Sequence, residues 1–398
     1  MLTKPISIMS NSKNPFIQLS VPSLKGNEWK YVKECIETEW VSSVGSYVER
    51  FERDVAGYLG VSCAIACVNG TAALHISMIL SGVGAGDEVI VPTLTFIAPV
   101  NVVRYVGAFP VFMDCDDSLN LDPQKLKDFL EKECEETKEG LKNKTSGRLI
   151  RAIVVVHVFG HPAEMQSISE IAGKYDLKVV EDATESLGSF YKNFNGAQKY
   201  TGTVSDFGCL SFNGNKLITT GGGGMILIQD SRLAERAKYL TTQAKDDGEN
   251  YIHHEIGYNY RLNNVQAAIG CAQMEKIDQF IQRKRENLKK YQEGIAGLTS
   301  LRFISEPPGT SSNNWLYTLV THDDVDLLRK KLKENGIEAR KIWKLNHRQK
   351  PYKACQTYKI EKAEWYHARC LNLPSSVSLK DEEIGRVISV LREFYGTN

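Results

Sequence analysis

From Cys63 to about Gln243 the sequence alternates short apolar runs with helical patterns, and this alternation constrains the fold more than any other feature. Such runs predict strands buried on both faces, because the connecting helices of a parallel sheet cover it. The predicted strands are Ala64–Val68, Glu88–Val91, Phe109–Met113, Ala152–Val158, Lys178–Glu181, Phe207–Phe212 and Met225–Ile228. The predicted helices are Ala72–Ser81, Ile97–Tyr105, Pro123–Glu136, Met165–Tyr175 and Arg232–Gln243.

The pattern therefore predicts an α/β fold whose mostly parallel sheet is covered on both faces, with ligands outside the carboxyl ends of its strands. A long amphipathic pattern from Asn263 to about Ile295 predicts one connecting helix into a second domain. That domain shows strand patterns at Trp315–Val320 and Glu338–Ile342 and helix patterns at Val325–Asn335 and Asp381–Phe394. We expect an N-terminal arm and large domain over 1–262, and the connecting helix with a smaller C-terminal α/β domain over 263–398.

Composition narrows the class of protein. A formal net charge of +1 gives no global basic field, so we expect no nucleic-acid partner. The nine cysteines form no CxxC pair, which indicates reduced thiols in a cytosol and no metal site. Residues 1–22 contain no apolar signal sequence, and no apolar run approaches the roughly 20 residues of a membrane helix. We expect a cytoplasmic protein without a membrane partner.

Lys216 stands just after a predicted strand, in the segment Ser211-Phe-Asn-Gly-Asn-Lys216, and the glycine run Gly221–Gly224 follows it. A lysine at a strand end, beside glycines that let backbones approach, is well placed to form an imine with an aldehyde. Desolvation that lowers its pKa would favour this chemistry. The alternative is a surface lysine in a loop. The glycine run matches neither GxGxxG nor GxxxxGK[ST], which argues against a dinucleotide or P-loop site.

Two carboxylates, Asp182 and Glu185, follow another predicted strand. A buried carboxylate at a strand end can pair with a protonated pyridine nitrogen, and a cationic ring is a strong electron sink. The alternative for Asp182 is an ordinary helix N-cap. Glu185 lies one turn further on, where it is expected to reach the ring hydroxyl or the substrate.

Asn69, Gly70 and Thr71 follow the first predicted strand and open a helix. Backbone N–H groups at a helix N-terminus attract phosphate, and the hydroxyls of Thr71 and Ser211 add donors. Phe96, after the next strand, can stack on a flat ring. The alternatives are a plain N-cap at Asn69 or Thr71 and a core position for Phe96.

The order of these residues is more informative than any one of them. A phosphate cup, an aromatic ring, a strand-end aspartate, a serine and a lysine, all within one parallel-sheet pattern, are the parts that a pyridoxal 5'-phosphate (PLP) site requires. We therefore predict PLP as the cofactor, held as a Schiff base on Lys216.

The chain resembles the DegT/DnrJ/EryC1/StrS family of sugar aminotransferases, within the fold type I PLP enzymes, from about Phe16 to the C-terminal helix. The matching segments are Asn69–Leu74, Gly86–Pro92, Val156–Gly160, Glu181–Ala183, Ser211–Lys216, Gly221–Met225, Gly257–Arg261 and Leu371–Pro374. The resemblance implies the fold type I, aspartate-aminotransferase-like fold and a PLP-dependent transamination.

The resemblance also implies roles for single residues. Lys216 would bind the cofactor and act as the base that moves the proton, and Asp182 would pair with the pyridine nitrogen. Glu185, where many members have Gln, would reach the ring hydroxyl, and Phe96 would stack on the ring.

The phosphate contacts implied by the resemblance come from two subunits. Gly70, Thr71 and Ser211 would hold the phosphate of their own subunit's cofactor. Asn259 would reach the phosphate of the neighbouring subunit's cofactor, which implies a homodimer with shared active sites.

The reaction implied by the resemblance moves an amino group from L-glutamate to a keto group, expected at C4, of a nucleotide-linked 6-deoxy sugar used in polysaccharide biosynthesis. Two segments, Phe212–Gly224 and Gly336–Trp343, resemble the LegC-like branch, which favours UDP-4-keto-6-deoxy-N-acetylhexosamine as acceptor. The alternative is a perosamine-type enzyme that uses GDP-4-keto-6-deoxymannose. His161 is a departure, because relatives often have Gln there.

The substrate contacts are predicted from residue type alone. The candidates for the sugar are Trp40, Ser42, Tyr47, Trp343 and His347, and those for the diphosphate are Arg261, Arg340, Lys344 and Arg348. Ordinary surface or interface positions are the alternative for each of them.

Three other functions were weighed against the aminotransferase. Sugar dehydratases of the same family carry His in place of the lysine, whereas position 216 is Lys. A non-catalytic PLP-binding regulatory protein is a second alternative, although no DNA-binding module precedes the domain. An amino-acid lyase of the same fold is the third, and the sugar-family segments argue against it.

Overall fold

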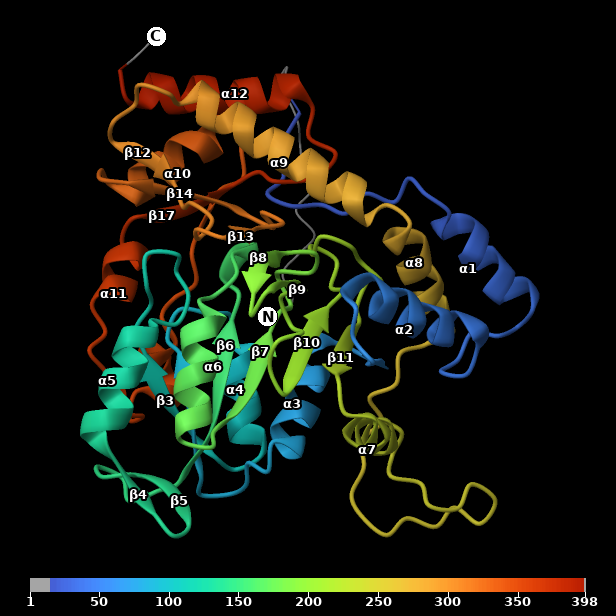
Figure 1. Cartoon of the computed structure of the whole chain (residues 1–398). Coiled ribbons are helices and arrows are strands. Elements are labelled where there is room, and N and C mark those ends of the chain that lie inside the picture. Colours follow the sequence, from blue (N-terminus) through green and yellow to red (C-terminus); the bar gives the residue numbers. More distant parts are fainter. Residues whose placement is uncertain (1–14, 397–398) are drawn as a thin grey trace.

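The structure, a computed structural model, describes residues 15–396 (Figure 1). Most of the expected N-terminal arm, residues 1–14, lies outside the described residues. Across 15–396, every helix is too short or too polar to span a membrane.

An eight-stranded sheet in the order β1-β11-β10-β7-β6-β2-β3-β16 forms the centre of the large domain. Strands β10, β7, β6, β2, β3 and β16 run parallel, whereas β11 lies antiparallel between β1 and β10. The predicted mostly parallel sheet is therefore confirmed. Its strands are β1 (Cys63–Cys67), β2 (Glu88–Pro92), β3 (Phe109–Met113), β6 (Ile150–Val156), β7 (Lys178–Asp182), β10 (Phe207–Ser211), β11 (Gly224–Ile228) and β16 (Thr357–Tyr358).

Both faces of this sheet are buried, because successive strand residues point to opposite sides and both sides carry apolar side chains. In β11, Ile226 packs on the face covered by α3, α4 and α7, whereas Met225 packs on the face covered by α2 and α8. Helices α5 and α6 cover the rest of that second face. The helices are α1 (Glu28–Glu37), α2 (Ser46–Leu59), α3 (Gly70–Leu80), α4 (Ala98–Tyr105), α5 (Pro123–Glu133), α6 (Met165–Lys174), α7 (Ser231–Thr241) and α8 (Asn264–Met274).

A smaller antiparallel sheet in the order β12-β14-β17-β15 lies at the other end of the molecule, beneath α9, α10 and α12 (Figure 1). Its strands are β12 (Leu301–Phe303), β14 (Tyr317–Thr321), β15 (Arg340–Lys341) and β17 (Cys370–Leu373). Its helices are α9 (Ile277–Gly294), α10 (Val325–Glu334) and α12 (Asp381–Phe394).

The expected single connecting helix from Asn263 to Ile295 is wrong, because α8 ends at Met274 and α9 begins at Ile277. α8 packs within the large domain, against α1 and α2, so closely that a Cβ at Gly270 would be 2.7 Å from the Phe51 ring. α9 begins in the same core, with Ile277 and Ile281, and only its C-terminal half packs onto the small sheet, through Tyr291. The break between the two helices therefore lies where the chain starts to leave the large domain.

Residues after 263 also contribute to the large domain. β16 extends the large sheet beside β3, and β13 (Thr310–Ser311) pairs with β8 (Phe190–Phe194), which pairs with β9 (Ala197–Tyr200). The division at 262/263 therefore stays a prediction. β4 (Cys134–Thr137) and β5 (Gly140–Asn143) form a hairpin, so the helix predicted to Glu136 ends at Glu133. The remaining elements are α11 (Lys362–His367), η1 (Val158–Gly160), η2 (Asn346–Arg348) and η3 (Lys350–Tyr352).

Candidate active site

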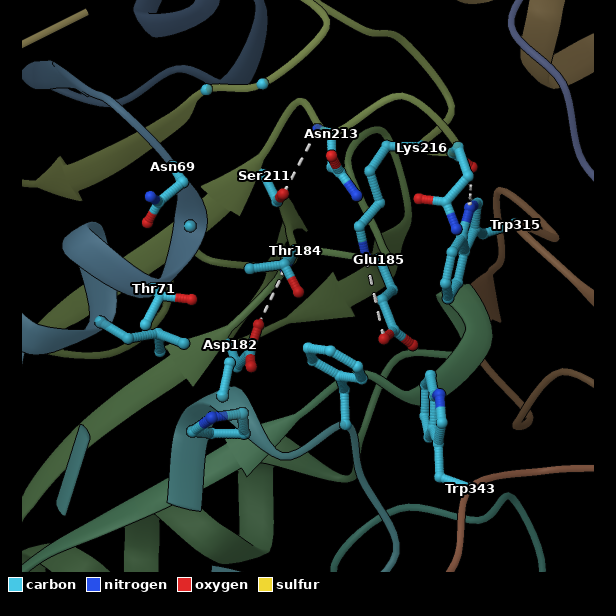
Figure 2. A pocket seen from close by; sticks show the side chains of 18 of the residues that line it. Asn69, Thr71, Asp182, Thr184, Glu185, Ser211, Asn213, Lys216, Trp315 and Trp343 are labelled. Atoms are coloured by element: carbon cyan, nitrogen blue, oxygen red, sulfur yellow. Dashed lines mark hydrogen bonds and ion pairs between the residues drawn. The ribbon is translucent and has the colours of Figure 1, made fainter. Parts of the chain in front are cut away.

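A cavity of about 290 Å³ opens where β7 and β10 end, beside the N-terminus of α3 (Figure 2). Its walls come from segments as far apart in the sequence as Asn69 and Trp343. The lining residues are Asn69, Gly70, Thr71, Leu74, Phe96, Ala98, Pro99, Asp182, Thr184, Glu185, Ser211, Asn213, Asn215, Lys216, Gly222, Gly223, Trp315, Arg340 and Trp343.

Lys216 projects into this cavity from the loop after β10 (Figure 2). Its Nζ lies 3.9 Å from Glu185 Oε1 and 4.0 Å from the centroid of the Trp315 ring. The side chain is only 13% exposed, and this burial lowers the pKa of the amine, against the opposing pull of Glu185 and Asp182. A lower pKa makes the amine available as a nucleophile and as a base nearer neutral pH.

The two carboxylates of the cavity are buried, and their only ion pair among the described residues is that of Glu185 Oε1 with Lys216 Nζ at 3.9 Å. Asp182 ends β7 and accepts a hydrogen bond from the backbone N–H of Thr184 at 3.1 Å. Glu185 accepts one from the backbone N–H of Phe159 at 2.8 Å. Burial raises the pKa of Asp182, and it raises the pKa of Glu185 to about 7. A carboxylate held in this way is stabilised by any cation that enters the cavity.

The N-terminus of α3 forms a cup for an anion. Asn69 caps the helix by accepting a hydrogen bond from the N–H of Ala72 at 2.8 Å. The first N–H groups of a helix, here those of Gly70 and Thr71, have no partner within the helix and attract a phosphate. The hydroxyl of Ser211 faces the same space from the end of β10.

The cup depends on close backbone contact. A Cβ at Gly70 would lie 2.9 Å from Ser211 Cβ, so a larger residue would displace the serine. A Cβ at Gly224, the first residue of β11, would lie 2.5 Å from the backbone nitrogen of Gly70. These glycines allow β10, β11 and α3 to meet at the cup.

The donor set fits PLP. The cup offers N–H and hydroxyl groups for a phosphate, and Lys216 offers an amine for the aldehyde. Buried Asp182 has no ion-pair partner among the described residues, which suits a protonated ring nitrogen. Phe96 is 54% exposed at the cavity wall, so its ring is free to stack on a planar group.

The cavity brings together most of the predicted site residues: Gly70, Thr71, Phe96, Asp182, Glu185, Ser211, Lys216, Arg340 and Trp343. Their roles remain predictions. The sequence reasoning missed Thr184, Asn213, Asn215 and Trp315. The first three are neighbours of predicted residues, whereas Trp315 enters from the start of the small domain and no local pattern marked it.

The other predicted substrate residues do not line this cavity within the described chain. In the N-terminal loop, backbone oxygens of Trp40 and Ser42 accept hydrogen bonds from Asn264. Tyr47 is buried and its hydroxyl donates to Glu34. His347 lies between Thr93 and Glu364, with Nδ1 2.6 Å from the threonine Oγ1. Lys344 and Arg348 also lie outside the lining.

Asn259 and Arg261 lie on the segment that returns from the loop after α7. Asn259 forms a bridge with Thr242, and Arg261 donates to the side chain of Gln243 at 3.1 Å. Neither residue lines the cavity of its own chain. Figure 1 shows the loop between α7 and this segment extending away from the body of the chain.

The chain is similar to known aminotransferases over nearly its whole length. The model of the DegT/DnrJ/EryC1/StrS aminotransferase family matches residues 22–392. A GDP-perosamine synthase of Escherichia coli O157:H7 is 38% identical over 383 residues, which cover 96% of this chain and 99% of that protein. A GDP-perosamine synthase of Caulobacter vibrioides is 37% identical over 385 residues, covering 95% and 98%.

A solved structure of a DegT DnrJ EryC1 StrS aminotransferase from Brucella abortus is 28% identical, with a TM-score of 0.84 and coverage of 93% of this chain and 96% of that one. Together with the observed sheet order, this likeness confirms the predicted fold type I PLP-transferase fold. The family match spans nearly the whole chain, and the predicted cofactor and reaction class are those of the family. The chain belongs to the DegT/DnrJ/EryC1/StrS family of PLP-dependent sugar aminotransferases.

Proposed function

We propose that this aminotransferase moves an amino group from L-glutamate to the C4 keto group of a nucleotide-linked 6-deoxy sugar. The observation that carries the proposal is the buried amine of Lys216, which lies within one cavity with Asp182, Glu185 and an anion cup. This arrangement suits a cofactor with an aldehyde, a basic ring nitrogen and a phosphate. The amino transfer itself is inferred from the family to which the chain belongs.

Two acceptors are candidates. GDP-4-keto-6-deoxymannose is supported by two GDP-perosamine synthases that are 37% and 38% identical to this chain. UDP-4-keto-6-deoxy-N-acetylhexosamine, the acceptor favoured by the sequence, rests on the segments Phe212–Gly224 and Gly336–Trp343. The assignment to a LegC-like branch stays a prediction, and the GDP sugar is the first acceptor to test.

Lys216 would act as the base of the reaction. PLP, when bound, would supply an electron sink for the bond from which a proton is removed. The Lys216 amine, which projects into the cavity, would be the group that takes the proton from the substrate Cα and later gives it back. The depressed pKa of the buried amine keeps a larger fraction unprotonated at neutral pH than an exposed lysine would have.

Asp182 and Glu185 would set the charge around the ring. The carboxylate of Asp182, 3% exposed, would stabilise a proton on the ring nitrogen by its negative charge. Glu185 Oε2 accepts from the N–H of Phe159, so Oε1 faces Lys216 and is the oxygen that would reach the ring hydroxyl.

The carboxylate or diphosphate of a substrate needs a cationic side chain, and Arg340 is the best candidate within one chain. Among the described residues that line the cavity, only Lys216 and Arg340 are basic. Arg340 also lines an adjoining cavity of about 350 Å³, which shares Phe96, Asn215 and Trp315 with the first. Its Nε and Nη2 bond Glu338, and the adjoining space is open to a carboxylate or diphosphate.

A second copy of the chain would complete the cofactor site. The cup of one chain offers N–H and hydroxyl donors but no basic side chain among the described residues. A phosphate dianion is better stabilised when further donors or cations approach it. Asn259 and Arg261, which follow the protruding loop after α7, are the residues that we propose the partner contributes.

The test is a visible absorption spectrum of the PLP-loaded protein before and after addition of L-glutamate. The expected result is a visible band that glutamate replaces by one at shorter wavelength, followed by recovery of the first band when the GDP keto sugar is added. A band that glutamate leaves unchanged contradicts the donor assignment. Recovery with the UDP sugar alone would move the acceptor to the second candidate.

A further inference from the structure

Trp315 is the aromatic residue in contact with the Lys216 amine, and it comes from a distant part of the chain. It lies just before β14 of the small sheet, 99 positions after Lys216 in the chain, yet its ring faces Lys216 Nζ at 4.0 Å (Figure 2). The ring is 4% exposed. An indole face attracts an ammonium group through its quadrupole, and this attraction grows when water is excluded.

Trp315 is held by one hydrogen bond from its indole and two at its backbone. Its Nε1–H donates to the backbone oxygen of Asn215, the residue before Lys216, at 2.7 Å. Its backbone N–H donates to Asn313 Oδ1 at 2.9 Å, and its backbone oxygen accepts from Ser375 Oγ at 3.1 Å. The ring is therefore fixed to the very segment that carries the lysine, so that its position relative to the amine is well defined.

Asn313 links Trp315 to the segment that carries Glu185. Its Nδ2 donates to the backbone oxygens of Glu185 and Leu187, both at 3.0 Å. Asn313 is 1% exposed. One short segment thus holds the Trp315 ring and the backbone of Glu185, whose carboxylate Oε1 is the other group close to Lys216 Nζ.

We propose that Trp315 is a positioning residue that holds the Lys216 side chain against its ring face while the lysine is released from the cofactor. This inference rests on the proposed transamination, in which Lys216 must be free when it moves the proton. A free lysine has four side-chain bonds to rotate, and most of its rotamers take the amine away from the reacting atom. The Trp315 face restricts it to positions between the ring and Glu185, which raises its effective concentration at the proton.

The experiment compares Trp315→Leu and Trp315→Phe with the native protein. Trp315→Leu removes the aromatic face, whereas Trp315→Phe keeps a weaker face and loses the Nε1–H donor. The first readout is the rate at which L-glutamate removes the visible band in a single turnover, together with its primary isotope effect for 2-deuterated glutamate. We expect a roughly tenfold slower rate and a larger isotope effect in Trp315→Leu, with Trp315→Phe in between.

The second readout needs no turnover. In the cofactor-free protein, the rate of visible-band formation with added PLP rises with pH as the Lys216 ammonium loses its proton. Loss of ring attraction destabilises the ammonium, so the midpoint of this profile should move to lower pH in Trp315→Phe. Glu185 and Asp182, the charged groups that face Lys216, are unchanged in both variants. Trp365→Leu, which lies outside both cavities, is the matched control.

Unchanged isotope effects in both variants, with an unchanged midpoint in Trp315→Phe, would overturn the inference and leave Trp315 as a wall residue. If the native protein gives no glutamate-dependent change, the proposed function fails, and the midpoint in cofactor-free protein still decides the role of Trp315. Should Trp315→Leu not fold, Trp315→Phe carries both readouts.

Discussion

At the scale of single residues, the site is governed by burial. The same desolvation lowers the pKa of the Lys216 amine and raises those of Asp182 and Glu185, so each group is shifted toward its neutral form. Perturbed pKa values of this kind cluster at functional sites.

Lys216→Ala removes both the attachment point of the cofactor and the base. We expect turnover with L-glutamate and the keto sugar to fall at least about a thousandfold, because base catalysis and covalent attachment are lost together. The visible band should also be absent from protein mixed with PLP. Steady-state rates and absorption spectra check this, and near-normal turnover would refute the assignment of Lys216.

His161, the departure from the family pattern, gives a pH-dependent prediction. It is 2% exposed, its Nδ1 has no hydrogen-bond partner among the described residues, and burial lowers its pKa to about 4. Unfolded chains protonate His near pH 6.5, so between about pH 4 and 6.5 the unfolded state binds more protons. The contribution of His161 to stability is therefore lost as the pH falls through this window.

In His161→Gln this loss should be absent. Between pH 7 and pH 5 we expect the native protein to lose about 2 kcal/mol of unfolding free energy more than the variant. Urea unfolding at both pH values, at the same saturating PLP concentration, measures the difference. Equal losses in the two proteins would show that His161 is protonated in the folded state.

At the scale of elements, the junction of β10, β11 and α3 forms the phosphate cup. A Cβ at Gly224 would lie 2.3 Å from the backbone carbon of Asn69, which is the N-cap of α3. Because that separation is far below a van der Waals contact, β11 or the helix N-terminus has to shift.

Gly224→Ala should therefore weaken PLP binding at least about tenfold, since the N–H groups that face the phosphate move with the helix N-terminus. Gly214→Ala is the matched control, because a Cβ at Gly214 meets nothing within 4 Å and its neighbours Asn213 and Asn215 line the same cavity. Titration of cofactor-free proteins with PLP gives the dissociation constants. Equal constants for the two variants would contradict the close contact at the cup.

At the scale of the whole molecule, the surface agrees with the proposed homodimer. Large apolar side chains are exposed on α1, on the loop after it and on the loop after α7: Trp29, Ile36, Trp40, Val44, Tyr251 and Ile256 are 55–80% exposed. Exposed apolar groups of this size are typical of surfaces that a partner covers. A second copy would bury them and bring its own Asn259 toward the cup.

Subunit mixing tests the shared site. Lys216→Ala and Asn259→Ala homodimers should each be impaired, whereas a mixture allowed to exchange subunits should regain activity. In the hybrid, one site combines the native Lys216 of one subunit with the native Asn259 of the other. If Asn259 served its own chain, no hybrid site would be intact and activity would stay low. Co-purification through an affinity tag carried by only one of the two variants checks that hybrid dimers form.

Sequence patterns were sufficient to predict the α/β class, the strand ends that carry chemistry and the positions of Lys216, Asp182, Glu185 and Thr71, whose roles stay predictions. These follow from local patterns, because apolar periodicity sets the strands and a strand end sets where the next side chains lie. The strand patterns near β7, β10 and β11 correspond closely to the observed elements. The antiparallel placement of β11 could not be read from its apolar run, which suits either direction.

Contacts between distant segments could be found only from the folded chain. Trp315 reaches Lys216, and β16 joins the large sheet, because the chain after Met274 folds back onto the large domain. The expected helix from Asn263 to Ile295 breaks between α8, which packs in the large domain, and α9, which runs from that core to the small sheet. Such choices depend on which surfaces meet in space, and a residue's neighbours along the chain do not specify them.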